Sequence, residues 1–256
     1  MSVVQKTLRD PAPSSAVAEP RHDDGTRPER GRRTRMRHLS GRLNLFQRTM
    51  LDWRELHPYI AVHAARIVGP LRHAAVKRAI DATLEETGLT GLELDRHRGR
   101  YEWRGGRSSG ALEVVAAGED WATTLATVFE RHLNEPFAAD GAIDPFRFFA
   151  IDQGDAFFLG IAYDHFIAGG DSIIVLLNAI ADRYAGSASP GAPLSRYPRT
   201  HWRLFARHPL HFVRGLARLP AMASSCRRTV RPRYREIADG RNAFTFFTLD
   251  PAEYLA

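Results

Sequence analysis

The stretch FRFFAIDQGDAFFLGIAYDHFIAGGDS, residues 146–172, decides the fold of this 256-residue chain. It contains two strongly apolar runs, residues 146–151 and 156–163. The four residues between the runs, Asp-Gln-Gly-Asp, have the polar, glycine-containing composition of a tight turn. The sequence therefore predicts a β-hairpin, because two apolar strands joined by so short a polar turn pair with each other.

A helix is predicted directly after the hairpin. Residues 172–184 place Ile173, Leu176, Leu177, Ile180 and Tyr184 at helical spacing, so these side chains form one buried face. Asp171 or Ser172 is the expected N-cap, since short polar side chains accept hydrogen bonds from the first free amides of a helix. The order is thus a strand, a loop that contains His165, and a helix.

Strands and helices are also predicted in the segments before the hairpin. Residues 59–68 are rich in small and β-branched side chains and predict a strand, and residues 71–87 predict a helix that ends at Gly88. A short strand is expected at 112–116, followed by a helix with Trp121, Leu125, Val128, Phe129 and His132 on one stripe. Alternating strands and helices indicate an α/β fold, here a mixed sheet flanked by helices.

The loop sequence YDHFIAGGDS, residues 163–172, resembles the HHxxxDG signature of condensation domains and related chloramphenicol-acetyltransferase-like, CoA-dependent acyltransferases. The opening segment LNLFQRTMLDWREL, residues 43–56, the strand at 59–68 and the step Gly69-Pro70-Leu71 into the next helix resemble the start of that fold. The resemblance runs from about residue 43 to residue 256. It covers the N-terminal half of the two-half family fold.

The resemblance implies acyl transfer, with His165 at the position of the catalytic histidine. That histidine acts as a general base on an acceptor hydroxyl or amine, which attacks a thioester of CoA or of a phosphopantetheine carrier arm. An imidazole suits this role because it titrates near neutral pH and can take and return a proton in one turnover. The resemblance implies no permanently bound cofactor, and the sequence has no metal-ligand spacing around its single cysteine, Cys226.

Two positions depart from the family signature. Asp164 replaces its first histidine, and we assign Asp164 no catalytic role because neighbours on a strand point to opposite faces. Gly169 replaces its aspartate, although Arg147 stands where the family has the arginine that pairs with that aspartate. Arg147 therefore needs another partner, either Asp171 or a backbone carbonyl, and it remains open whether Asp171 pairs or only caps the helix. Gly170 and Ser172 are expected to be structural residues of the same loop.

The expected organisation has four parts. Residues 1–38, rich in proline and arginine, predict a disordered basic leader. Residues 39–190 form the acyltransferase-like N-terminal half, and residues 191–242 a basic, amphipathic helical linker. Residues 243–256 resemble the start of a second half that is otherwise missing. A lone half lacks one side of the family's substrate tunnel, so we expect no catalysis by this chain alone. We expect instead a homodimer, an aggregation-prone monomer, or a complex with a separately encoded second half.

The charge distribution bears on other kinds of partner. The net charge is +7 and the pI about 10.0, but the arginines gather in the leader and between residues 196 and 235. Between these two regions the charge is close to balanced, and the basic residues there form no recognised nucleic-acid-binding pattern with aromatic residues, so nucleic acid is not an expected partner. Residues 201–219 predict short basic amphipathic helices broken at Pro209, which suit either a peripheral membrane surface or a solvated linker. No apolar stretch is long enough to span a membrane, which favours the cytoplasm.

Two other functions compete with acyl transfer. The altered signature and the short chain favour a non-catalytic remnant or interaction module that keeps the fold. The arginine clusters favour a basic protein associated with a membrane surface.

Overall fold

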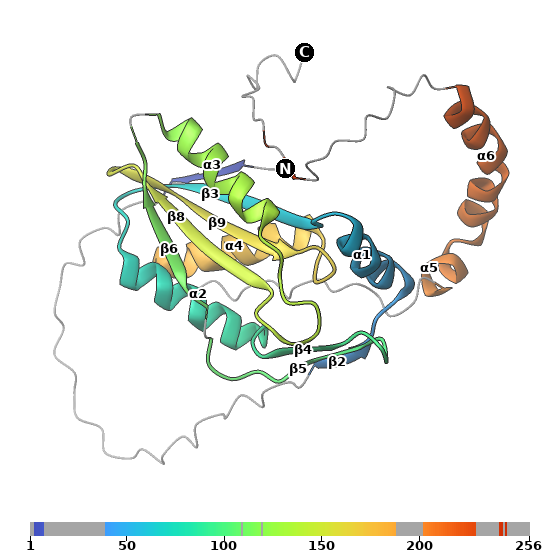
Figure 1. Cartoon of the computed structure of the whole chain (residues 1–256), viewed down its shortest axis with the longest axis horizontal. Helices are drawn as coiled ribbons and strands as arrows, with labels where there is room; N and C mark the ends of the chain where they lie inside the picture. Colours follow the sequence, from blue (N-terminus) through green and yellow to red (C-terminus); the bar gives the residue numbers. More distant parts are fainter. Residues whose placement is uncertain are drawn as a thin grey trace, which may run out of the picture.

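A computed structural model describes residues 3–7, 39–108, 110–118, 120–187, 202–228, 241–242 and 244. Its centre is a mixed five-stranded sheet in the order β1-β3-β9-β8-β6 (Figure 1). The strands are β1 (Val3–Thr7), β3 (Ile60–Val68), β9 (Ala156–Asp164), β8 (Phe146–Asp152) and β6 (Leu112–Ala116). β9 runs antiparallel to both β3 and β8, whereas β1 and β6 run parallel to their neighbours. The predicted mixed sheet is confirmed.

The predicted hairpin forms β8 and β9, with Phe146 opposite Tyr163 and Asp152 opposite Phe157. In its turn, Gly154 takes a positive φ of 88° and its amide donates to Asp152 Oδ1 over 2.9 Å. All nine residues of β9 are buried, because helices cover both faces of the sheet. A strand covered on both sides reads as an unbroken apolar run, which explains the composition of residues 156–163.

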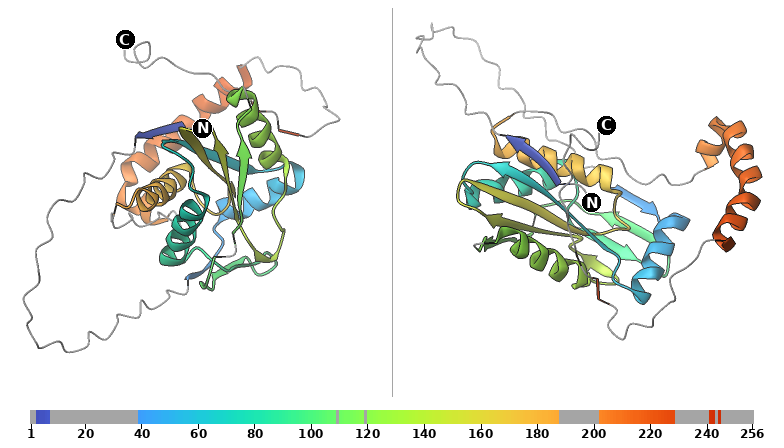
Figure 2. Two further views of the ribbon diagram at one scale, coloured as in Figure 1. Left: turned by 90° about the vertical axis from the view of Figure 1, so that its left-hand side faces the viewer. Right: turned by 90° about the horizontal axis from the view of Figure 1, so that it is seen from above.

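Two helices pack on one face of the sheet and one on the other (Figure 2). α2 (His73–Thr87) and α4 (Gly170–Tyr184) share a face with a core that includes Ile67, Ile80 and Ile161. α3 (Trp121–Asn134) covers the opposite face, where Phe129 packs against Val62 and Phe149. α1 (Leu45–Leu56) lies at the end of the sheet where β9 finishes (Figure 1).

A second, smaller sheet was not predicted from the sequence. Its antiparallel order is β2-β5-β4-β7, built from β2 (Leu39–Arg42), β5 (Arg100–Trp103), β4 (Leu92–Asp95) and β7 (Gly141–Ile143). Each strand has only three or four residues, and the burial of β4 alternates along the chain. Such short, half-polar strands carry a weak pattern, and β7 lies far from β4 in the sequence.

The leader contains one strand that the sequence analysis did not expect. β1 pairs in parallel with the edge strand β3, with Val3 opposite Ala64 and Thr7 opposite Val68. Its two valines have high β propensity, and the free edge of β3 offers backbone hydrogen-bond partners. A prediction of disorder from composition alone does not consider such pairing. The prediction of a disordered leader is therefore wrong for these five residues. The rest of the leader lies outside the described residues.

The basic segment forms two helices, α5 (Trp202–Arg207) and α6 (Pro209–Arg228). The interruption between them is at His208, next to the predicted position, Pro209. α6 is longer than expected, with 20 residues. Its large apolar side chains are exposed, Leu210 by 73% and Val213 by 61%. Of the predicted start of a second half, only Phe244 is described, and its ring lies 4.9 Å from that of Phe129.

Gly160 in β9 should tolerate no side chain. A Cβ there would lie 2.0 Å from the Phe149 ring, which packs directly over the glycine. Gly160→Ala is expected to lower the free energy of unfolding by about 3 kcal/mol, the upper range for overpacking a core. Gly118→Ala is a matched control, because its Cβ would meet Thr124 at an ordinary 3.7 Å. Equal denaturant midpoints for the two variants would contradict this packing.

Candidate functional site

His165 lies at the junction between β9 and α4. Its amide donates to the Tyr59 carbonyl over 3.4 Å, and the Ile167 amide closes a turn onto the Asp164 carbonyl over 3.0 Å. The half-buried imidazole stacks on the Tyr59 ring with centroids 5.2 Å apart, and the Tyr163 ring lies 5.9 Å away. The strand-to-helix position predicted for His165 is therefore present, and the two tyrosines restrict how its ring can turn.

The start of α4 faces this junction. The N-cap is Gly169, without a side-chain hydrogen bond, so the prediction of Asp171 or Ser172 as the cap is wrong. The reason is that the helix begins earlier than its apolar stripe suggests. Asp171 is exposed in the first turn, where a negative charge favours the helix dipole. Ser172 is buried, and its amide donates to the Gly169 carbonyl over 3.1 Å.

Gly170, the first residue of α4, packs against His63 of β3. A Cβ on Gly170 would lie 3.2 Å from Cε1 and 3.5 Å from Nε2 of the His63 imidazole. The structural role expected for Gly170 thus has a physical basis, since the close approach of helix and ring leaves little room for a side chain. Burial lowers the pKa of His63, and the charge of His165 lowers it further.

α1 holds the loop that carries His165. Gln47 Nε2 donates to the Phe166 carbonyl over 3.1 Å. Arg54 forms a buried ion pair with Asp164 and also donates to the Ala138 carbonyl over 3.1 Å. Burial raises the pKa of the Asp164 carboxyl, and the Arg54 charge partly offsets that rise. Asp164, which replaces the first signature histidine, therefore ties the loop to α1.

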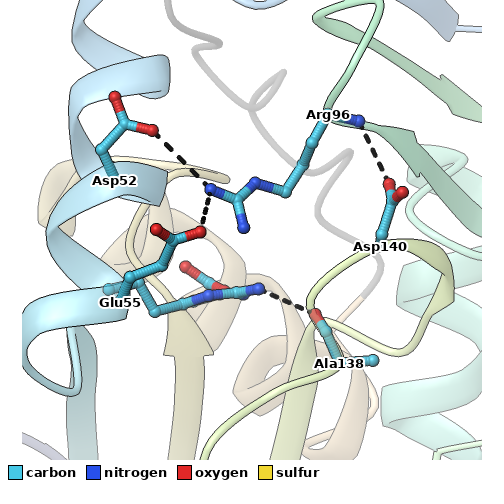
Figure 3. A network of polar contacts seen from close by, with 7 residues as sticks. Asp52, Glu55, Arg96, Ala138 and Asp140 are labelled. Atoms are coloured by element: carbon cyan, nitrogen blue, oxygen red, sulfur yellow. Dashed lines mark hydrogen bonds and ion pairs between the residues drawn. The ribbon is translucent and has the colours of Figure 1, made fainter.

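A second arginine joins the same end of the molecule to α1. Arg96 pairs with Glu55 at 2.7 Å and with Asp52 at 3.7 Å, and its amide donates to Asp140 over 3.1 Å (Figure 3). Both carboxylates of α1 are largely exposed, so these pairs contribute little free energy individually. Together they connect α1 with the segments beside β4 and β7.

Solved structures share this arrangement of sheets and helices. The first condensation domain of the calcium-dependent antibiotic synthetase, in complex with a substrate analogue, matches with a TM-score of 0.51 and 18% identity. The match covers 60% of this chain and 42% of that one. The tallysomycin biosynthesis protein TlmII gives a TM-score of 0.54 at 16% identity, covering 72% of this chain and 47% of that one. This chain has the condensation-domain fold.

The starter condensation domain of rhizomide synthetase RzmA also matches, with a TM-score of 0.50, 16% identity and coverage of 60% and 40%. The chain thus spans less than half the length of the condensation-domain structures it matches. No family model and no curated protein matches the sequence.

Arg147 was predicted to pair with either Asp171 or a backbone carbonyl, and it contacts a backbone carbonyl. Its guanidinium donates to the Glu135 carbonyl, lies 2.8 Å from Glu135 Oε2 and sits 3.9 Å over the Phe137 ring. Asp171 as its partner is wrong. Arg147 pairs in register with Ala162, whose side chain faces α3, whereas Asp171 belongs to the helix on the opposite face.

Sequence reasoning missed four residues around His165: Gln47, Arg54, Tyr59 and His63. Only His63 gave a signal, as the one ionisable ring in the middle of an apolar strand. The open pocket lined by Trp121, Asp152 and Gly154 lies at the opposite end of β9 and takes no part in this site. Among the described residues, no cluster of His, Cys, Asp or Glu could hold a metal ion.

Proposed function

We propose that this chain is one half of a condensation-type acyltransferase, which moves an acyl group from a CoA or carrier-protein thioester to a hydroxyl or amine. One observation carries the proposal: in a condensation-domain fold, His165 stands between the end of β9 and the start of α4. The low identity to the solved domains means that their fold, and not their activity, supports the assignment.

In the proposed reaction, His165 is the general base. Its imidazole takes the proton of the acceptor O–H or N–H while the acceptor oxygen or nitrogen bonds to the thioester carbonyl carbon. The carbonyl electrons move onto the oxygen, then return as the carbon–sulfur bond breaks. The imidazolium gives its proton to the departing thiolate, which leaves as a thiol. The buried Arg54–Asp164 pair and the Gln47 hydrogen bond keep the loop of His165 in place for this sequence.

The experiment that tests the proposal follows donor binding separately from turnover. CoA thioester binding is measured on the full chain by NMR, with octanoyl-CoA as the probe and free CoA as the control. We expect octanoyl-CoA to shift the side-chain signals of His165 and free CoA to leave them unmoved. Octanoyl-CoA binding that never perturbs His165 would refute the proposed site.

The full chain alone is expected to show no turnover. Acyl transfer requires the base, the thioester and the acceptor in a channel that excludes water, and the chain spans 42% of the condensation-domain length. Sedimentation and a thioester-cleavage assay check this expectation together. A well-behaved monomer with His165-dependent turnover would contradict it.

Two observations favour other functions. The altered signature, with Asp164 paired to Arg54 and Gly169 as a helix cap, suits a non-catalytic module that retains the fold. The exposed apolar side chains of α6 and the arginines Arg214 and Arg218 suit an anionic surface, including that of a membrane. No described helix has the length and apolar composition needed to cross a membrane. Salt-sensitive binding to anionic vesicles, without any response to octanoyl-CoA, would favour this surface role.

A further inference from the structure

His63 is a buried polar side chain whose hydrogen-bonding capacity the fold leaves unused. It lies in β3 opposite Ile161, and only 9% of its surface is exposed. Within the described part of the chain, its buried Nδ1 has no hydrogen-bond partner, and no hydrogen bond from its Nε2 is found. A buried polar group without a partner costs free energy, so such groups call for an explanation beyond packing.

The surroundings of His63 belong to the His165 site. The His63 ring lies 5.7 Å from that of Tyr163, which in turn lies 5.9 Å from that of His165. The Cε1–Nε2 edge of His63 points at Gly170, where α4 begins. The amides of Gly170 and Asp171 find no acceptor among the described residues, as expected for the first turn of a helix. Gly170 and the Cε1–Nε2 edge of His63 thus lie close together at the start of α4, and the Tyr163 ring is near both His63 and His165.

We propose that His63 is a second functional histidine of this site, whose Nε2–H donates a hydrogen bond to the thioester carbonyl oxygen of the bound acyl donor. The inference rests on the proposed acyl-transfer function and adds a residue to it. As the acceptor attacks the carbonyl carbon, negative charge develops on this oxygen, and it is lost again when the carbon–sulfur bond breaks. Donors already fixed around that oxygen stabilise the charge without reorganising.

The physical state of His63 suits this role. Burial lowers its pKa, with a further contribution from His165, and both favour the neutral ring. A neutral imidazole donates from one nitrogen only, and the Nε2 that faces Gly170 is the one next to the helix start. A neutral donor next to His165 also avoids placing a second positive charge beside an imidazole that must take up a proton. The amides of α4 add the positive end of the helix dipole.

The test uses the full chain and octanoyl-CoA labelled with carbon-13 at its thioester carbonyl. On binding to the wild-type chain, we expect the carbonyl signal to move downfield and the nitrogen-15 signal of His63 Nε2 to shift. His63→Phe should still bind the CoA portion but lose the downfield shift, and His63→Gln, which keeps an N–H donor, should restore it. In a form that turns over, His63→Phe should lower kcat by roughly 10², with KM little changed.

Each outcome separates this inference from the function on which it rests. A carbonyl shift that is equal in the wild-type chain and in His63→Phe overturns the role of His63 and leaves the acyltransferase proposal intact. An unmoved His63 Nε2 signal in the octanoyl-CoA complex overturns it as well, whatever the stability of the variants. If octanoyl-CoA changes no signal of the wild-type chain, both the role of His63 and the proposed function fail.

Discussion

Arg54→Met is expected to lower the free energy of unfolding by about 3–5 kcal/mol, the cost of leaving a buried charge without its partner. The side chains of Arg54 and Asp164 are 7% and 2% exposed, so water cannot replace the lost interaction. Chemical denaturation followed by circular dichroism measures the loss. Arg48→Met is a matched control in the same helix, because Arg48 is exposed and forms no ion pair within the described residues.

The loss should depend on pH, and its direction follows from Asp164. Burial raises the pKa of this carboxyl, so the native chain takes up the proton at a higher pH than the unfolded chain does. Between the two values the native state binds more protons, and stability falls as pH rises. Arg54→Met removes the charge that lowers this pKa and extends the window toward neutral pH. The deficit of the variant should therefore shrink as the pH is lowered toward 4.

A companion variant separates the charge from the packing. If the deficit comes from an unpaired carboxylate, adding Asp164→Asn to Arg54→Met should recover a substantial part of the lost stability at pH 7. The two residues lie in one ion pair, so their effects should not add. A double variant as unstable as Arg54→Met alone, with no change between pH 4 and pH 7, would show that the ion pair is not what holds the loop to α1.

The central sheet and its helices could be predicted because their residues carry strong local patterns. β9 is buried on both faces and reads as one apolar run, and Gly154 marks the turn before it. The helix α2 ends at Gly88, whose positive φ of 71° explains why a glycine closes it. The small sheet escaped prediction because β4 and β7 are short and pair across a long sequence separation.

The candidate site, likewise, could be predicted only in part from the sequence. His165 could be placed because its signature is contiguous and lies between a strand and a helix. Its supporting residues could not, because they come from distant segments: Arg54 and Asp164 are 110 residues apart, and Gln47 and Phe166 are 119 apart. Of the two partners predicted for Arg147, Asp171 was wrong for a related reason. Asp171 lies two residues after Gly169, but this closeness takes no account of the alternation along β8, which turns Arg147 toward α3.

His165→Ala is expected to lower acyl transfer by ~10²–10⁴, the usual contribution of a general base. The measurement is single-turnover transfer from octanoyl-CoA to an amine acceptor, in a preparation that turns over. The physical reason is that His165 alone among the described histidines lies between β9 and α4, with its ring next to those of Tyr59 and Tyr163. Binding of octanoyl-CoA should change little, because the lost group acts on the acceptor proton.

Two comparisons make this result specific to proton transfer. His97→Ala removes an exposed histidine from a turn far from the motif loop in the sequence, and it should leave the rate unchanged. Added imidazole should restore part of the rate of His165→Ala, since a small base can occupy the space left between the two tyrosines, and it should not affect His97→Ala. An active preparation in which His165→Ala keeps near-full turnover would remove His165 from the chemistry, and the condensation-domain fold would then have to serve as an interaction module.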